Sequence, residues 1–193
     1  TSKFFQGHLS FWDYLEKTRA ADPANYDIYF PMGLLHYHLD QLPGVTRFLS
    51  SLLITAGDHH RGIRELELAM QKGALLRELA QAELSSVYIN FERQPALALP
   101  MTVDLRERFP RNFNFSFSLA LIFSELGRFD EAYAIAREME MGIQAGTPPF
   151  APQLQPRYDH LLGRILFNQR EYAGAGEYFQ KVLKDTAPYH ARI

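Results

Sequence analysis

Seven histidines are the side chains of this chain best suited to bind a metal ion. His36 and His38 are two residues apart, so on a helix their side chains point about 160° away from each other. His59 and His60 are adjacent and are expected to diverge as well. Zinc sites on helices favour pairs three or four residues apart with a carboxylate nearby. The spacing therefore predicts no metal site: we expect His36 to pack like an aromatic residue and His59 and His60 to begin an exposed helix.

Nucleophilic catalysis would need a serine held by a histidine and a third orienting group. The sequence contains no Gly-x-Ser-x-Gly elbow, and its serine pairs, Ser50–Ser51 and Ser85–Ser86, lie in segments expected to be helical, where small residues suit close packing. Acid pairs such as Glu65 and Glu67 are two residues apart and are expected to be solvated. No glycine-rich phosphate-binding loop is present in the sequence either. We therefore expect no enzyme, no catalytic residue and no cofactor.

Phenylalanine alternates with polar residues over residues 112–117. Residues two apart cannot share one helix face, so we expect one of Phe115 and Phe117 to pack between helices and the other to face outward. Core packing is the favoured role, but an exposed Phe117 would be a natural hydrophobic anchor for a partner.

The charge balance argues against nucleic acid as a partner. Lys and Arg number 20 against 22 Asp and Glu, whereas phosphate contacts need a basic excess or stripe. The densest basic segment, 106–111, is interrupted by Glu107, Phe109 and Pro110. Hydrophobic residues make up 47% of the chain, enough for a continuous core, but no apolar run reaches the roughly 18–20 residues of a membrane span. The chain has no cysteine, which excludes disulfides.

The sequence begins at Thr1, and Thr1–Gly7 does not have the pattern of a signal peptide. We therefore expect a fragment of a longer protein, with any targeting signal upstream. Its composition leaves open whether the compartment is the cytoplasm or a bacterial periplasm.

Turn signals such as Asp22–Pro23 and Gly127 divide the chain into apolar-periodic segments of helical length. Asp58 and Asp130 stand where helix N-caps are expected. Because no segment alternates convincingly like a strand, we expect an all-α fold. The predicted helices are 8–20, 26–40, 44–56, 59–72, 75–91, 95–108, 113–126, 129–142, 156–169 and 171–185.

A repeat of about 34 residues relates the later helices. Ala98 and Ala132, each near the start of a second helix, are 34 residues apart. Ala175 follows 43 residues after Ala132, which equals one period plus a loop rich in proline and glycine over 142–156. Gly62 lies 36 residues before Ala98 and extends the series less regularly.

The first-helix segments Leu119–Phe123, Leu162–Leu166 and Tyr29–His36 carry the Leu-Gly-x-x-Tyr type of core. With this period they resemble the tetratricopeptide repeat superfamily. Segments 37–43, 48–53 and 57–66 also look like a bacterial subgroup of that superfamily with no assigned function. The resemblance implies a right-handed superhelical solenoid of antiparallel helical hairpins, one domain over 1–193. Its expected parts are irregular hairpins over 7–73, two regular repeats over 75–141, the loop over 142–156 and a last repeat over 157–185.

The superfamily implies a concave groove, lined by first helices, that binds a peptide or protein element. The positions expected to face this groove are Glu83, Val87, Asn90, Asn114, Phe117, Leu121, Arg157, His160, Arg164 and Asn168. The Lys–Asn carboxylate clamp known in the superfamily is missing, although Arg157 and Arg164 could receive an acidic group.

We therefore expect a protein–protein interaction scaffold that is not an enzyme. The alternatives are a scaffold that self-associates, giving a homo-oligomer, or a receptor for a small molecule. An accessory domain of an enzyme is a third, less favoured option.

Overall fold

The computed structural model describes residues 2–44, 46 and 56–190, with side chains over 11–44, 46 and 56–184. All regular structure within these ranges is helical, in agreement with the predicted all-α class. The chain divides into two compact units, Thr1–Leu84 and Ser85–Ile193. No helix within the described ranges is both long and apolar enough to cross a bilayer.

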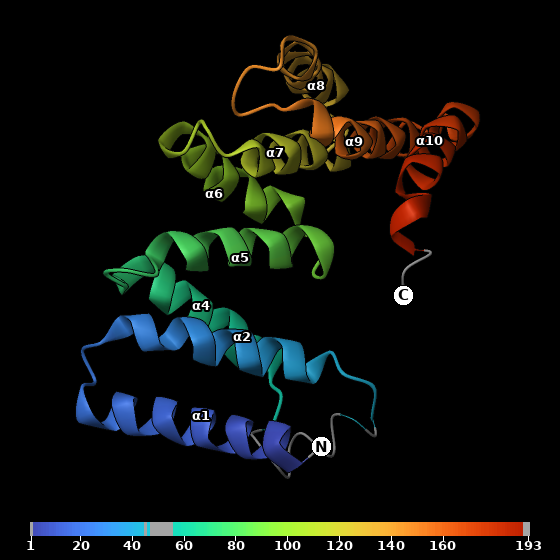
Figure 1. Ribbon diagram of the computed structural model, residues 1–193. Coiled ribbons are helices and arrows are strands. Elements are labelled where there is room, and N and C mark those ends of the chain that lie inside the picture. The colour runs from blue at the N-terminus through green and yellow to red at the C-terminus, as the bar shows by residue number, and fades with distance from the viewer. Residues whose placement is uncertain (1, 45, 47–55, 191–193) are drawn as a thin grey trace. The chain divides into compact units, whose positions relative to one another are not determined.

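Within its described residues the first unit contains three α-helices, a short 3₁₀ turn and the beginning of a further helix (Figure 1). They are α1 (Ser2–Ala21), η1 (Tyr26–Ile28), α2 (Tyr29–Asp40), α4 (His59–Lys72) and the first part of α5 (Arg77–Asn90). The prediction of 59–72 is confirmed without change, and Asp58 caps α4 by accepting a hydrogen bond from the Arg61 N–H at 2.9 Å. The helix expected at 44–56 lies mostly outside the described residues.

Helices α2 and α4 form a hairpin whose backbones meet at two glycines. A Cβ atom added to Gly62 would lie 2.6 Å from the backbone nitrogen of Tyr37 and 2.8 Å from the carbonyl oxygen of Gly33. Real Cβ atoms do not approach backbone this closely, so the crossing requires glycine at position 62. Leu15 of α1 packs with Ile28 and Met32 to form a small apolar cluster beside this hairpin.

The hairpin also buries a polar network. His36 is 1% exposed, and its Nδ1 lies 2.5 Å from Oε2 of Glu65, which is 7% exposed. The Nε–H of Arg61 donates to the other oxygen of Glu65 at 2.9 Å. The expectation that Glu65 is solvated is therefore wrong, because the carboxylate is drawn inside by these two partners. His36 does pack as an aromatic residue, edge-on to Trp12 at 5.1 Å between ring centroids.

The prediction that the side chains of His59 and His60 diverge is also wrong. The centroids of the two rings are 4.0 Å apart. Nδ1 of His59 lies 2.6 Å from Oδ2 of Asp40, which draws the ring toward the end of α2. Within the described residues no group of three or more His, Cys, Asp or Glu side chains is arranged to hold a metal ion.

The second unit continues α5 and, over the residues described up to 190, adds five α-helices and a 3₁₀ turn. They are α6 (Pro95–Arg108), α7 (Phe113–Glu125), α8 (Phe129–Ala145), η2 (Pro152–Leu154), α9 (Gln155–Asn168) and α10 (Tyr172–His190). Helices α6 and α8 begin 34 residues apart, the spacing expected from the repeat. Asp130 is not an N-cap as predicted, because α8 already begins at Phe129 and places Asp130 in its first turn.

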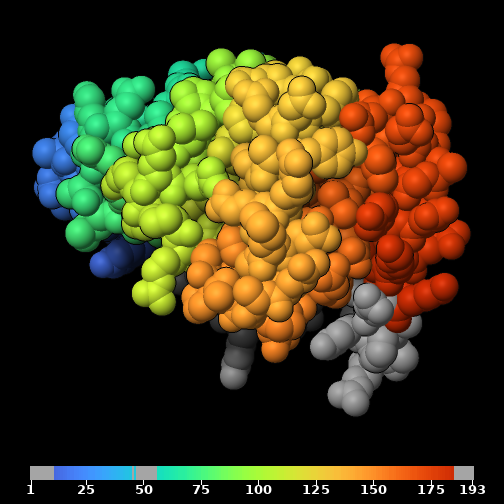
Figure 2. Space-filling view, turned by 90° about the horizontal axis from the view of Figure 1, so that it is seen from above, coloured from blue at the N-terminus to red at the C-terminus, as the bar shows by residue number. Residues whose placement is uncertain are grey.

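The connection after α8 is shorter than the loop expected over 142–156. Helix α8 continues to Ala145, where Gly146 adopts a left-handed conformation and ends it. Phe150 then packs back onto Gly142, where a Cβ atom would clash with its ring. In the space-filling view the side chains of α8 (yellow) meet those of the segment that follows (orange) without a gap (Figure 2).

The helices of this unit pack as successive hairpins. Helix α7 contacts α6, α8 and α9, and α9 contacts α10. Helices α7, α8 and α9 and the connection after α8 share a core made of Leu119, Ala120, Leu121, Ala132, Ile135, Ala136, Met139, Ile143, Phe150, Tyr158, Leu161 and Ile165. Ala132, one of the small residues that define the repeat, is fully buried, so its size allows the close approach of α7 and α8.

Candidate functional site

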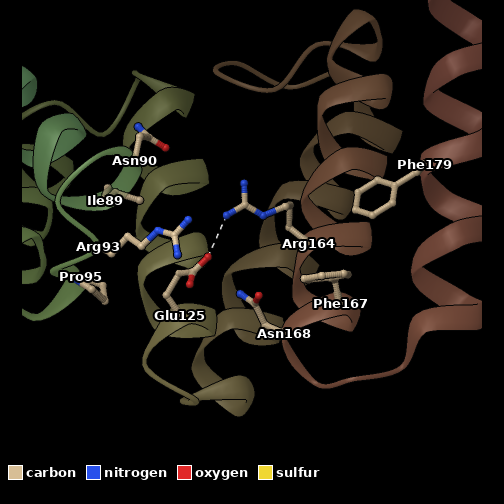
Figure 3. Close-up of a pocket in the computed structure, with 9 residues that line it drawn as sticks. All are labelled: Ile89, Asn90, Arg93, Pro95, Glu125, Arg164, Phe167, Asn168 and Phe179. Atoms are coloured by element: carbon tan, nitrogen blue, oxygen red, sulfur yellow. Dashed lines mark hydrogen bonds and ion pairs between the residues drawn. The ribbon is translucent and has the colours of Figure 1, made fainter. Parts of the chain in front are cut away.

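A cavity of about 590 Å³ opens in the second unit near the C-terminal ends of α5, α7 and α9 (Figure 3). Its lining combines charged, amide and apolar side chains. These are Ile89, Asn90, Arg93, Pro95, Glu125, Arg164, Phe167, Asn168 and Phe179. Three of the residues expected to face a groove, Asn90, Arg164 and Asn168, therefore lie in one cavity.

Arg164 and Glu125 form an ion pair across the cavity, with 2.8 Å between Nη2 and Oε1. Both side chains are about one-third exposed, so water screens the pair. Asn168 donates from Nδ2 to the hydroxyl of Ser124 at 3.0 Å, and Asn90 donates to the carbonyl of Ser86 at 3.1 Å. These contacts hold the two amides at the cavity wall.

Arg93 is one of the lining residues that sequence reasoning missed. It occupies the turn between α5 and α6 with φ of 53°, a left-handed conformation that is uncommon for a residue other than glycine. Figure 3 shows its side chain reaching toward the carboxylate of Glu125. It has no hydrogen-bond or ion-pair partner among the described residues. The cavity thus holds two guanidinium groups and one carboxylate.

A second group of predicted site residues forms a stack beside the cavity. The guanidinium of Arg157 lies 4.7 Å from the ring centroid of Phe113 and 5.3 Å from that of Phe117. The ring of His160 stacks on Phe117 at 6.4 Å and lies 5.9 Å from Phe179. Phe179 also lines the cavity, so it joins the two groups. Phe117 is only partly buried but is covered by Arg157, which limits its use as an exposed anchor.

The remaining predicted positions lie elsewhere. Asn114 does not line the cavity; it belongs to the first turn of α7, where it donates to Asn112 at 3.0 Å. Val87 and Leu121 are buried, so the prediction that they face a groove is wrong. Their positions on the helices turn them toward the interior. Glu83 belongs to the first unit and lies 3.1 Å from His38.

His160 makes the second unit sensitive to acid. Burial lowers the pKa of His160 below its ordinary value, and the charges of Arg164 and Arg157 act in the same direction. Its proton is therefore bound more readily in the unfolded chain. Stability contributed by neutral His160 is complete above the unfolded pKa and is lost as the pH falls through the folded pKa.

Lowering the pH from 7.5 to 5.5 should lower the urea midpoint of both His160→Gln and the unsubstituted protein. We expect the smaller decrease in His160→Gln, since glutamine does not titrate. Urea unfolding followed by circular dichroism at the two pH values measures this. Equal falls in both proteins would assign the acid sensitivity to other groups.

Comparisons of the chain with family models, with curated proteins and with solved structures find no match.

Proposed function

We propose that this chain is a tetratricopeptide-like interaction module that binds a peptide segment of a partner protein along α7 and α9. The observation that carries the proposal is the cavity of about 590 Å³ together with the stack joined to it through Phe179. Three successive first helices of the expected repeat contribute to it, which is the arrangement by which helical repeats present a continuous binding face.

The length of the polar and aromatic stripe on α9 suits an extended peptide. Arg157 and Asn168 stand at opposite ends of the stripe on α9, which also contains His160 and Arg164. Eleven residues of helix span about 16 Å. An extended chain covers about 3.3 Å per residue, so this stripe matches roughly five peptide residues. Amide, guanidinium and aromatic side chains along it can meet both the backbone and the side chains of such a segment.

A receptor for a small molecule is the second candidate, because the cavity volume falls within the range of small-molecule sites. Such sites are lined predominantly by apolar side chains. Here Asn90, Arg93, Glu125, Arg164 and Asn168 make the lining more polar than that, which favours a peptide.

Selection of a displayed library of random twelve-residue peptides on the intact chain tests the proposal. Asn90 is exposed at the cavity wall, so Asn90→Trp is expected to fill the cavity and weaken the selected peptides at least tenfold, or about 1.4 kcal/mol. Met141→Trp, at an exposed position of α8 outside the cavity, is the matched control and should leave the affinity unchanged. A selection that yields no peptide, or peptides that Asn90→Trp does not affect, would reject the proposal.

A further inference from the structure

The ion pair in the cavity is easy to break. Arg164 and Glu125 are each about one-third exposed, and exposed pairs of this kind contribute at most about 1 kcal/mol. A guanidinium can bind a carboxylate through two parallel hydrogen bonds. Only one contact, between Nη2 and Oε1, joins this pair. Another carboxylate that offered better geometry could therefore take the place of Glu125.

The charges around this pair favour an acid. Arg93 and Arg164 together carry one positive charge more than Glu125 neutralises. The C-terminal ends of α7 and α9 add partial negative charge. Carbonyl groups of their last turns are bonded, which reduces this contribution: the N–H of Arg128 donates to Phe123 at 2.8 Å and that of Glu171 donates to Leu166 at 2.9 Å. A basic group entering the cavity would meet two guanidinium groups, whereas an acidic group would meet two donors.

We propose that Glu125 is an internal competitor for a carboxylate of the ligand, which displaces it from Arg164 and is held by Arg164 and Arg93 together. This inference rests on the proposed peptide-binding function and specifies its chemistry. The amides of Asn90 and Asn168 border the same space and can donate to the ligand, while Phe167 and Phe179 add apolar surface to the lining. The ligand class is thus a carboxylate flanked by apolar groups.

The proposal has an unusual consequence: removal of an acidic residue from the site should strengthen binding of an acid. In Glu125→Gln the side chain keeps its size and loses its charge, so Arg164 no longer has to exchange partners. We expect the affinity for an acidic ligand to rise about two- to fivefold, the range that an exposed ion pair allows. Arg93→Gln and Arg164→Gln should each lower it about tenfold, as loss of a charged hydrogen bond does.

The probe is the capped pentapeptide acetyl-Ala-Leu-Glu-Leu-Ala-amide, titrated into the intact chain and followed by the NMR signals of the arginine side-chain Nε–H groups. The glutamine version of the peptide is the neutral reference. The glutamine peptide with a free C-terminal carboxylate and the small diacid glutarate distinguish a chain end and a free acid from an internal side chain. Glu131→Gln is the control for Glu125→Gln, since Glu131 forms an exposed ion pair with Arg128 outside the cavity.

Preferential binding of any carboxylate probe over the capped glutamine peptide, together with tighter binding by Glu125→Gln but not by Glu131→Gln, supports the proposal. Equal binding of the glutamate and glutamine peptides would overturn it, as would weaker binding by Glu125→Gln. Peptides selected from the random library that bind the cavity without a carboxylate would also overturn it, yet would leave the peptide-binding function intact.

Discussion

Replacing Gly62 by leucine is expected to unfold the hairpin of α2 and α4. At this position even a Cβ atom would overlap the backbone of Tyr37 and Gly33, and neither helix can shift without losing its contacts with the other. Overpacking a core costs about 1–3 kcal/mol where side chains can move aside. Here the obstacle is backbone, so the cost should exceed that range and approach the whole stability of a small unit, about 5 kcal/mol.

Hydrogen exchange measured on peptides from 29–40 and 59–72 locates the effect, and the protection of both segments should be lost in Gly62→Leu. Gly176→Ala provides the contrast. A Cβ atom at Gly176 meets nothing within 4 Å, so alanine there should stabilise α10 by about 1 kcal/mol through its higher helix propensity. Native protection in Gly62→Leu would show that the two helices do not cross as closely as the structure indicates.

The buried network of His36, Glu65 and Arg61 gives the second large effect. In Glu65→Leu, His36 is left buried with neither ring nitrogen paired, since its Nε2 already has no partner among the described residues. Removing one member of a buried polar pair leaves the other desolvated, which costs about 3 kcal/mol. We expect the free energy of unfolding to fall by that amount.

The double variant His36→Phe with Glu65→Leu should recover most of this loss. Phenylalanine keeps the aromatic contact with Trp12, and no unpaired polar atom of the pair remains. Urea unfolding of both single variants and the double variant gives the coupling energy, which we expect to be about 2 kcal/mol. Arg64→Leu, an exposed position of the same helix, should change stability by less than about 0.5 kcal/mol. If the losses of unfolding free energy in the two single variants add up in the double variant, His36 and Glu65 do not stabilise each other.

Local signals in the sequence were sufficient for the all-α class and for the positions of most helices in the described part of the chain. Asp58 marks the beginning of α4, and Ala98 and Ala132 mark two helices that each bury a small residue, because caps and close packing depend on neighbours a few residues away. Glu65 could not be placed in this way. Its partner His36 is 29 residues distant, and only the crossing of α2 and α4 brings the two together.

Only part of the candidate site could be predicted from the sequence. Asn90, Arg164 and Asn168 share a cavity, as expected if the proposed repeat places the ends of its first helices on one side. Glu125 stands at the corresponding end of α7, so the same reasoning could have found it. Arg93 carries no such signal, because a residue after a helix end reaches the cavity only through the left-handed turn that it adopts.

The left-handed turn at Arg93 costs stability but places a cation for the proposed binding of an acid. Gly127 and Arg170 adopt the same left-handed conformation in the turns that end α7 and α9, and glycine is the residue that does so without strain. Glycine at position 93 would therefore make the unit more stable by about 1 kcal/mol while removing one of the two cations of the cavity. A search for heat-resistant variants of this protein should favour that substitution, and it would thereby weaken the proposed binding of an acidic ligand.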